Sequence, residues 1–248
     1  MIDNGATYVK DKAVSVLGAA RSGMAVANLL ARHGARVFVS EYGMLSDEKK
    51  GTLDKQGVRW EEGGHSGAAV QADFVVISPG VPSGTSIVKQ ITLAGRPVYS
   101  EIEVASWFCK APIVAITGSN GKTTTTELLG HAFTLAGTTT WVCGNMGTPF
   151  SGLADQTSEV DVVVLEVSSF QLDYIESFRP KVSVLLNITP DHLDRYDYNI
   201  DLYAASKLRI SKNQTDSDVL VFNMDDQGIR ERMPITHSDA VPVRIVVV

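Results

Sequence analysis

The chain has 248 residues, of which 44% are hydrophobic and 20% are charged, and its formal net charge is −6. This length is sufficient for two domains with buried cores, and the composition is typical of a globular protein. The negative charge argues against a nucleic-acid-binding protein, which needs a basic face. The amino terminus lacks the features of a signal peptide, and no apolar run approaches the roughly eighteen residues of a membrane span.

The two cysteines, Cys109 and Cys143, do not form a CxxC pair, so we expect neither a zinc site nor a disulfide framework. Both are interpreted as reduced, part-buried thiols of a cytoplasmic protein. The final apolar run, residues 243–248, is interpreted as a strand at the chain end.

In the first part of the chain, short apolar runs alternate with helical segments, which is typical of a parallel α/β sheet. We predict strands over residues 13–18, 36–40 and 73–78, and helices over residues 22–33 and 101–108. The pattern predicts a Rossmann-like domain over residues 1–98, followed by a linker over residues 99–111.

The turn after the first strand, Gly18-Ala19-Ala20-Arg21-Ser22-Gly23, is similar to a dinucleotide-binding turn but lacks the GxGxxG spacing. Glu41 ends the second strand, where such folds place an acid that binds a ribose. Alone, the pattern indicates a nucleotide site of low specificity. The alternative is a Gly-Ala turn that lets the helix pack closely on the strand.

A second series of elements begins at Pro112 and predicts a central domain over residues 112–248. We predict strands over residues 113–117, 161–166, 181–187 and 219–222, and helices over residues 122–136 and 201–211. The two halves together predict an α/β protein in which a Rossmann-like domain precedes a P-loop-type ATPase domain with a mainly parallel sheet.

The segment TGSNGKTT follows a predicted strand and opens a predicted helix. Its glycines let backbone N–H groups surround phosphate oxygens, its lysine reaches the terminal phosphates, and its hydroxyl can ligate magnesium. The usual formula has a glycine at position 116, where this chain has Ile116, so the match is incomplete. The alternative is a glycine-rich turn with a chance lysine. The candidate ATP-binding residues are Gly118, Ser119, Asn120, Gly121, Lys122, Thr123 and Thr124.

Glu166 ends a neighbouring predicted strand, and a carboxylate there suits a magnesium ion held beside the loop. The alternative is a solvated acid at a strand end.

Five ordered motifs, TGSNGKTT, GNMG, LEVSSFQL, NITPDHLDRY and YAASKLRI, closely resemble the central domain of the Mur ligases. The residues of the motifs SSFQL and DHLDRY are most similar to those of the D-glutamate-adding members. The resemblance covers nearly the whole chain and weakens after about residue 225. It implies a cytoplasmic, monomeric ligase of peptidoglycan synthesis, and so of cell shape and division. That enzyme uses ATP and Mg²⁺ to join D-glutamate to UDP-N-acetylmuramoyl-L-alanine through an acyl phosphate.

The resemblance also implies roles for individual residues. Lys122, His192 and Lys207 are expected to be catalytic. Thr123 and Glu166 are expected to hold one magnesium ion, and His192 and a carbamylated Lys207 a second, because a carbamate supplies the anionic oxygen that an ammonium lacks. The expected substrate-binding residues are Arg21, Ser22, Glu41, Tyr42 and Gly80 for the UDP part, and Asn145, Ser168 and His192 in the central domain.

The family has a third, carboxyl-terminal domain, which we expect to be absent here, with the central domain itself incomplete. Activity of the chain alone is therefore left open. The rival interpretations are another Mur ligase or a folylpolyglutamate synthetase-like ligase, an NAD(P)-dependent oxidoreductase, and a non-catalytic nucleotide- or UDP-sugar-binding module.

Overall fold

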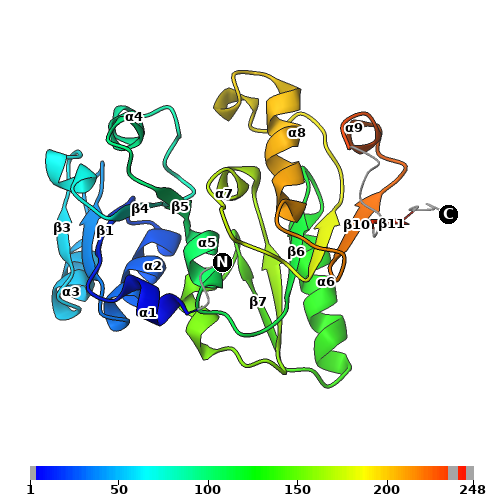
Figure 1. Cartoon of the computed structure of the whole chain (residues 1–248), viewed down its shortest axis with the longest axis horizontal. Helices are drawn as coiled ribbons and strands as arrows, with labels where there is room; N and C mark the ends of the chain where they lie inside the picture. Colours follow the sequence, from blue (N-terminus) through cyan, green and yellow to red (C-terminus); the bar gives the residue numbers. More distant parts are fainter. Residues whose placement is uncertain (1–3, 234–239, 244–248) are drawn as a thin grey trace. The chain divides into compact units, whose positions relative to one another are not determined.

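The computed structural model describes residues 4–233 and 240–243, which divide into two compact units (Figure 1). The first unit holds the described residues of Met1–Cys109 together with Pro149–Gln156 and Tyr174–Ser177. The second holds Lys110–Thr148, Thr157–Asp173 and the described residues of Phe178–Val248. Residues 99–111, predicted as a linker, contain part of a strand and a helix of the first unit. The chain therefore passes between the units several times.

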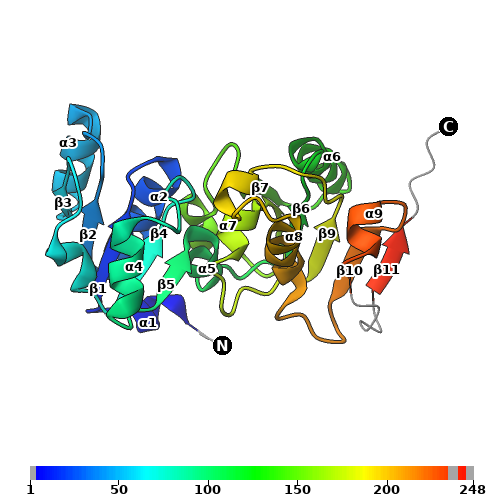
Figure 2. The same cartoon turned by 90° about the horizontal axis from the view of Figure 1, so that it is seen from above.

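The first unit is built on a five-stranded parallel sheet of order β3-β2-β1-β4-β5. Its main elements are α1 (Gly5–Val9), β1 (Ala13–Leu17), α2 (Arg21–Arg32), β2 (Arg36–Ser40), α3 (Asp47–Lys55), β3 (Arg59–Glu61), β4 (Phe74–Ile77), α4 (Ser86–Leu93), β5 (Val98–Ser100) and α5 (Glu101–Ser106), with the short 3-10 turns η1 (Gly67–Val70), η2 (Phe150–Gly152) and η3 (Ala154–Gln156). Figure 2 shows α2 and α4 on opposite faces of this sheet. The order matches the beginning of the Rossmann order, in which ligands bind where the strand order reverses, here between β1 and β4.

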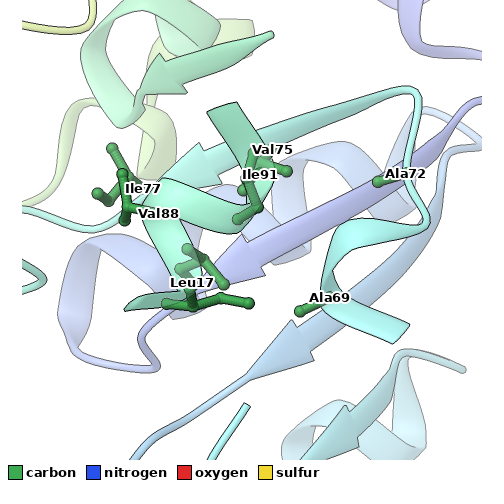
Figure 3. Close-up of a cluster of buried hydrophobic side chains, with 8 residues drawn as sticks. Leu17, Ala69, Ala72, Val75, Ile77, Val88 and Ile91 are labelled. Carbon is green, nitrogen blue, oxygen red and sulfur yellow. The ribbon is translucent and has the colours of Figure 1, made fainter. Parts of the chain in front are cut away.

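The strands are continuous apolar runs because helices cover both faces of the sheet. Figure 3 shows how α4 closes one face: Val88 and Ile91 of the helix lie beside Leu17 of β1 and Val75 and Ile77 of β4. All five side chains are at most 4% exposed. Burial of each of the larger ones stabilises the unit by roughly 1.5–3 kcal/mol.

The second unit is built on a six-stranded parallel sheet of order β11-β10-β9-β6-β8-β7. Its elements are β6 (Ile113–Thr117), α6 (Lys122–Leu135), β7 (Thr140–Gly144), β8 (Val162–Glu166), α7 (Ser169–Leu172), β9 (Val182–Leu185), η4 (Leu193–Arg195), α8 (Ile200–Leu208), η5 (Arg209–Ser211), β10 (Val219–Asn223), α9 (Gln227–Arg230) and β11 (Ala240–Val243). Figure 2 shows α6 and α8 on opposite faces. β6 lies inside the sheet, so its carboxyl end is flanked by two other strand ends.

The predicted fold class is confirmed: both units are α/β, with parallel sheets. All the strands predicted within the described residues are present within one or two residues of their predicted ends. The helix predicted over residues 201–211 is α8 followed by the 3-10 turn η5. The sequence patterns did not indicate α3, β3, α4, β5 or β7. Of the terminal strand predicted over residues 243–248, all but Val243 lies outside the described residues, and β11 ends at Val243.

None of the described helices is both long and apolar enough to cross a membrane.

Candidate functional site

The glycine-rich segment of the second unit is a tight turn between β6 and α6. Ile116, at the position where the usual formula has glycine, is a fully buried residue of β6, so the loop is short and begins at Gly118. Gly121 precedes α6 with a φ of 82°, a left-handed conformation that favours glycine. No side chain caps the amino terminus of α6, so its first N–H groups are available to an anion.

Side chains that follow β9 hold this turn in shape. Asn187 accepts a hydrogen bond from the Asn120 N–H through Oδ1 (2.8 Å) and donates through Nδ2 to the Asn120 carbonyl (3.1 Å). Ser119 Oγ donates to the Thr189 carbonyl (2.8 Å) and lies 3.1 Å from the Tyr203 hydroxyl. Sequence reasoning did not single out Asn187, Thr189 or Tyr203, although two of them lie in the motif NITPDHLDRY. The loop is therefore fixed by contacts from the neighbouring strand end and from α8.

Two lysine ammonium groups converge on one carbonyl oxygen of the turn. Lys122 Nζ donates to the Gly118 carbonyl at 2.8 Å and to the Ser119 carbonyl at 2.9 Å. Lys207 Nζ, from α8, also donates to the Gly118 carbonyl at 2.8 Å. The two charges repel each other, and an anionic ligand placed between them and the start of α6 would be stabilised by both.

Lys207 is 1% exposed, which is unusual for a lysine. Burial, together with repulsion from Lys122, lowers the pKa of Lys207 to about 7, and the carboxylate of Asp191 opposes this shift. The Nζ atom also lies 4.6 Å from the centre of the Tyr203 ring, a cation–π contact. A lysine in this environment is neutral at a lower pH than an exposed one.

Glu166 forms a second polar centre beside the turn. Its carboxylate accepts hydrogen bonds from the Thr123 hydroxyl (2.7 Å) and the Asn145 amide (3.4 Å), and the residue is 2% exposed. Within the described part of the chain, no Lys, Arg or His forms an ion pair with this carboxylate.

The donor set of Glu166 and Thr123 fits a magnesium ion. Both offer hard oxygen atoms, and Mg²⁺ in proteins commonly takes one or two such ligands and completes its shell with phosphates and water. The described residues contain no group of three or more His, Cys, Asp or Glu side chains that could hold a metal by themselves, so nucleotide phosphates would supply the remaining ligands.

His192 and Ser168 do not contact the side chains of Lys207 or Glu166 through hydrogen bonds among the described residues. His192 has a left-handed backbone (φ 49°), its side chain is 60% exposed, and its Nε2 lies 3.7 Å from Asp191. Within the described residues it forms no hydrogen bond with Lys207 or Glu166. Ser168 is buried and caps α7, where it and Gln171 form reciprocal side-chain-to-backbone hydrogen bonds.

A separate pocket of about 510 Å³ lies in the first unit, at the carboxyl ends of β1, β2 and β4. Of the five predicted UDP-binding residues, Glu41, Tyr42 and Gly80 line it. Its other lining residues are Gly18, Ala20, His65, Ser78, Val81, Pro82, Thr85, Ser86 and Ile87. The pocket lies where the strand order reverses, which is the usual ligand position in such sheets.

Arg21 and Ser22 open α2 and do not line the pocket. A Cβ atom at Gly23 would lie 1.9 Å from the Gly18 carbonyl oxygen, so this glycine permits close packing of α2 on the turn. The role of Gly23 therefore fits the alternative interpretation of this turn, in which glycine lets the helix pack closely. Gly18 and Ala20 of the same turn line the pocket.

Comparison with known proteins agrees with these features. Residues 116–244 match the Mur ligase middle domain, and residues 13–87 match the MurD N-terminal domain. The chain is 55% identical over 227 residues to the UDP-N-acetylmuramoylalanine–D-glutamate ligase of Salinibacter ruber, covering 90% of this chain and 49% of that protein. It is 50% identical over 231 residues to the ligase of the same name from Chloroherpeton thalassium, again covering 90% of this chain and 49% of that protein. The chain thus spans about half the length of the curated relatives it matches.

Solved structures show the same fold at lower identity. The UDP-N-acetylmuramate:L-alanyl-gamma-D-glutamyl-meso-diaminopimelate ligase from Neisseria meningitides aligns with a TM-score of 0.60 at 18% identity, over 89% of this chain and 74% of that chain. The UDP-N-acetylmuramate–alanine ligase from Thermotoga maritima aligns with a TM-score of 0.53 at 20% identity, over 94% of this chain and 53% of that chain. With a family match over more than half of its residues, the chain belongs to the Mur ligase family.

Proposed function

We propose that this chain forms the UDP-substrate-binding and ATP-binding parts of an ATP-dependent amide ligase that adds D-glutamate to UDP-N-acetylmuramoyl-L-alanine. The observation that carries the proposal is the glycine turn at the uncapped start of α6, where the Lys122 ammonium lies at the Gly118 carbonyl and the Thr123 hydroxyl at the Glu166 carboxylate. A cation and a helix amino terminus at one turn suit a polyphosphate, and the paired oxygen atoms beside the turn suit the magnesium ion that accompanies it.

In the second unit, residues Gly118–Thr124 bind the phosphates of ATP, and Lys122 contacts the terminal ones. Thr123 and Glu166 hold the magnesium ion that accompanies ATP, which neutralises phosphate charge. The hydrogen bond between their side chains supports this pairing, because it already brings the hydroxyl and carboxylate oxygens within 2.7 Å of each other.

Lys207 is proposed to react with carbon dioxide and, as a carbamate, to join His192 around a second magnesium ion. The buried, low-pKa amine supports the first step, since only a neutral amine attacks carbon dioxide. Asn145 and Ser168 are proposed to lie against the substrate, as is His192. The hydrogen bond from Asn145 to Glu166 supports the placement of Asn145 next to the phosphate site.

In the first unit, the pocket at β1, β2 and β4 is proposed to bind the UDP part of the substrate. Glu41, Tyr42 and Gly80 line it, and Arg21 and Ser22 are proposed to contact the ligand from the start of α2. The uncapped amino terminus of α2 favours the negative charge of a diphosphate.

The proposed reaction has two steps. The carboxylate of the muramoyl-alanine substrate attacks the terminal phosphorus of ATP and releases ADP. The amine of D-glutamate then attacks the acyl carbon of the resulting acyl phosphate, phosphate leaves, and the amine loses a proton. The residues described here position the reacting groups and neutralise charge. The proposal places the protein in the cytoplasm as a monomer in peptidoglycan synthesis.

Ligand binding by the chain itself tests the two sites separately. In calorimetric titrations, ATP with MgCl₂ and UDP-N-acetylmuramoyl-L-alanine should each bind with one site, and NADH should not bind. Failure of ATP to bind would contradict the phosphate-loop assignment. Saturable NADH binding would support an oxidoreductase and contradict the UDP site.

A chimera tests the amide ligation. Residues 1–230 of this chain would be joined to the carboxyl-terminal half of the Salinibacter ruber relative. We expect release of phosphate that requires both UDP-N-acetylmuramoyl-L-alanine and D-glutamate, with L-glutamate as the matched control. A chimera that binds both nucleotides but forms no amide would favour a non-catalytic nucleotide-binding module.

The same chimera tests the carbamate. Under ¹³C-labelled bicarbonate, NMR should show a carbamate signal that disappears in Lys207→Ala, and short carboxylates such as acetate or formate should partly restore the activity of that variant. An active chimera without the signal, whose Lys207→Ala variant keeps its activity, would show that Lys207 has no such role.

A further inference from the structure

A polar cluster of Ser40, Glu61 and His65 borders the pocket of the first unit and has no part in the function proposed above. We infer that His65 is a specificity-determining residue of this pocket, whose Nε2 accepts a hydrogen bond from a donor on the nucleoside part of a uridine nucleotide. The inference rests on the proposed function, because it requires that the pocket binds the UDP part of the substrate.

Ser40 contacts both of the other side chains. Ser40 ends β2 and is fully buried. Its Oγ lies 2.6 Å from Glu61 Oε1, at the end of β3, and 2.7 Å from His65 Nδ1. The backbone N–H of Ser66 also donates to Glu61 Oε1, at 2.9 Å. These contacts hold the imidazole ring through one of its two nitrogen atoms.

The tautomer of His65 follows from which groups of this cluster can donate a hydrogen bond. Burial alone would raise the pKa of Glu61, but hydrogen bonds from Ser40 and Ser66 outweigh it and hold that pKa below its ordinary value. Glu61 is therefore an ionised carboxylate, which can only accept. The single hydroxyl hydrogen of Ser40 is used on Glu61, so the Nδ1 of His65 carries the hydrogen that joins it to Ser40. In the neutral ring, Nε2 is then an acceptor.

This nitrogen is an acceptor in the wall of the pocket, in addition to the side-chain oxygens of Glu41, Ser78 and Thr85. His65 lines the pocket, and its ring centre lies 6.0 Å from that of Tyr42. Within the described residues, Nε2 has no partner of its own. Glu41 lies where a ribose-binding acid would be; its two oxygens accept the N–H groups of Ala19 (2.6 Å) and Gly43 (2.9 Å), and each oxygen keeps a second acceptor site for a ribose hydroxyl.

The chemistry of the acceptor limits what it can bind. Ionised phosphate oxygens carry no hydrogen to donate, whereas a nucleoside offers the N3–H of uracil and the hydroxyl groups of ribose. Val81, Pro82 and Ile87 make part of the pocket apolar, so an unused acceptor there would lose its bonds to water. A site built around such an acceptor discriminates strongly against ligands that lack the donor.

Calorimetric titration of the whole chain with UDP tests the inference. In H65N the shorter amide replaces Nδ1 and keeps the contact with Ser40 but has no atom at the Nε2 position, whereas in H65Q the longer amide reaches that position. We expect H65N to bind UDP about tenfold or more weakly, and H65Q to stay within about threefold of the wild type. His131→Asn, at an exposed histidine of α6 in the other unit, is the matched control and should bind UDP normally.

Modified nucleotides identify the donor. 3-Methyl-UDP lacks the uracil N–H, and 2′-deoxy-UDP lacks one ribose hydroxyl. The analogue that lacks the donor should bind the wild type more weakly than UDP does, while H65N should not distinguish it from UDP. If H65N binds UDP as tightly as the wild type, the inference is wrong and the proposed function stands. If the wild type does not bind UDP at all, both are wrong.

The state of the imidazole ring provides a readout independent of binding. Nitrogen-15 NMR of the chain above the titration range of its histidines should show a His65 ring protonated at Nδ1 and unprotonated at Nε2. The signal is assigned by its loss in H65N, since the chain has five histidines. In Ser40→Ala, where the acceptor for Nδ1 is lost, the preference for this tautomer should weaken. A neutral wild-type ring protonated at Nε2 instead would overturn the inference.

Discussion

The two units share one local motif, a strand, a glycine-containing turn and a helix without a side-chain cap, but they bury their charges in different places. In the second unit, Glu166 and Lys207 are buried next to the turn, with the loop itself among their partners. In the first unit, the buried carboxylates Glu101 and Glu103 lie on α5. Besides Trp107 Nε1, their partners include backbone and side-chain donors of the segments 149–156 and 174–177.

The two sets of buried charges have different roles: one stabilises the fold, and the other favours ligand binding. Glu103 accepts hydrogen bonds from Trp107 Nε1, the N–H and hydroxyl of Ser177, and the Glu176 N–H, so its charge is satisfied within the fold. The ammonium groups of Lys122 and Lys207 instead repel each other at the same carbonyl, and either a bound anion or loss of the Lys207 charge would remove that repulsion. The first arrangement holds later segments of the chain in the first unit, and the second favours a ligand.

The largest expected effect is on stability and concerns Glu103. Glu103→Ala leaves donors from Trp107, Ser177 and Glu176 without their acceptor, so the free energy of unfolding should fall by roughly 3–5 kcal/mol. Urea unfolding followed by circular dichroism measures it. Glu159→Ala, at an exposed glutamate, is the control and should change stability by less than about 0.5 kcal/mol. A loss below about 1 kcal/mol for Glu103→Ala would mean that this carboxylate does not hold the segment.

The second effect is on ligand binding and concerns Lys122. Lys122→Ala removes a charged contact to phosphate, so ATP–Mg²⁺ binding should weaken by about 1.5–3 kcal/mol, or roughly 10- to 150-fold. Calorimetry should show unchanged UDP binding in the same variant, and Lys212→Ala, at an exposed lysine of the same unit, should leave ATP binding unchanged. An unaltered ATP affinity in Lys122→Ala would contradict the assignment of the turn.

The third effect is on the turn of the first unit. Gly23→Ala places a Cβ atom 1.9 Å from the Gly18 carbonyl oxygen and 2.6 Å from Ser78 Oγ, so α2 must move. We expect a loss of about 1–3 kcal/mol in stability and weaker UDP binding. Gly51→Ala in α3, where a Cβ atom meets nothing within 4 Å, should instead stabilise by about 0.4–1 kcal/mol. Thermal unfolding of both variants gives the comparison, and a harmless Gly23→Ala would contradict the close packing.

The smallest effect is a change in pH dependence at Glu101. Burial raises the pKa of Glu101, although the hydrogen bond from the Ser151 N–H opposes this shift. Since the folded pKa exceeds the unfolded one, the stability that Glu101 contributes is present below its ordinary pKa, 4.5, and is lost as pH rises through the raised value. Among the residues that the structure describes, Glu101 Oε2 and Ser151 Oγ are buried without a hydrogen-bond partner, and a glutamine at position 101 would remove the buried charge and add an N–H donor there.

Glu101→Gln should therefore raise the free energy of unfolding at pH 8 by about 1 kcal/mol, with a smaller gain at pH 5. Melting curves at both pH values measure the difference. Identical pH slopes for the wild type and the variant would contradict the raised pKa.

Several features could be predicted from the sequence because they depend on neighbouring residues. The central strands were found from continuous apolar runs, since a parallel strand covered on both faces has no polar side. α3 was missed because only Leu53 of this helix is buried, which leaves no apolar periodicity. Its Ser46 cap, its acidic first turn and Lys55 in its last turn were signals that could have identified it.

Some features of the candidate site could likewise be predicted from the sequence, and others could not. The TGSNGKTT turn and the carboxylate of Glu166 were evident from the sequence, because a loop and a strand end occupy known positions in a parallel sheet. Motif resemblance assigned a role to Lys207, but its burial and its contact with the Gly118 carbonyl, 89 residues away, depend on how α8 packs. The support that Asn187 and Tyr203 give the turn could likewise not be read from the chain order.

The sequence by itself determined the α/β class, the two turns and the family, since apolar periodicity, glycine spacing and ordered motifs are local properties. Only the tertiary structure decided which charges meet. It brought Lys207 to the turn that holds Lys122, satisfied Glu103 with donors from a segment more than 70 residues later, and joined His65 to Ser40 and Glu61 at the wall of a pocket. The physical reason is that hydrogen bonding and desolvation depend on distances between atoms, which packing sets and sequence separation does not.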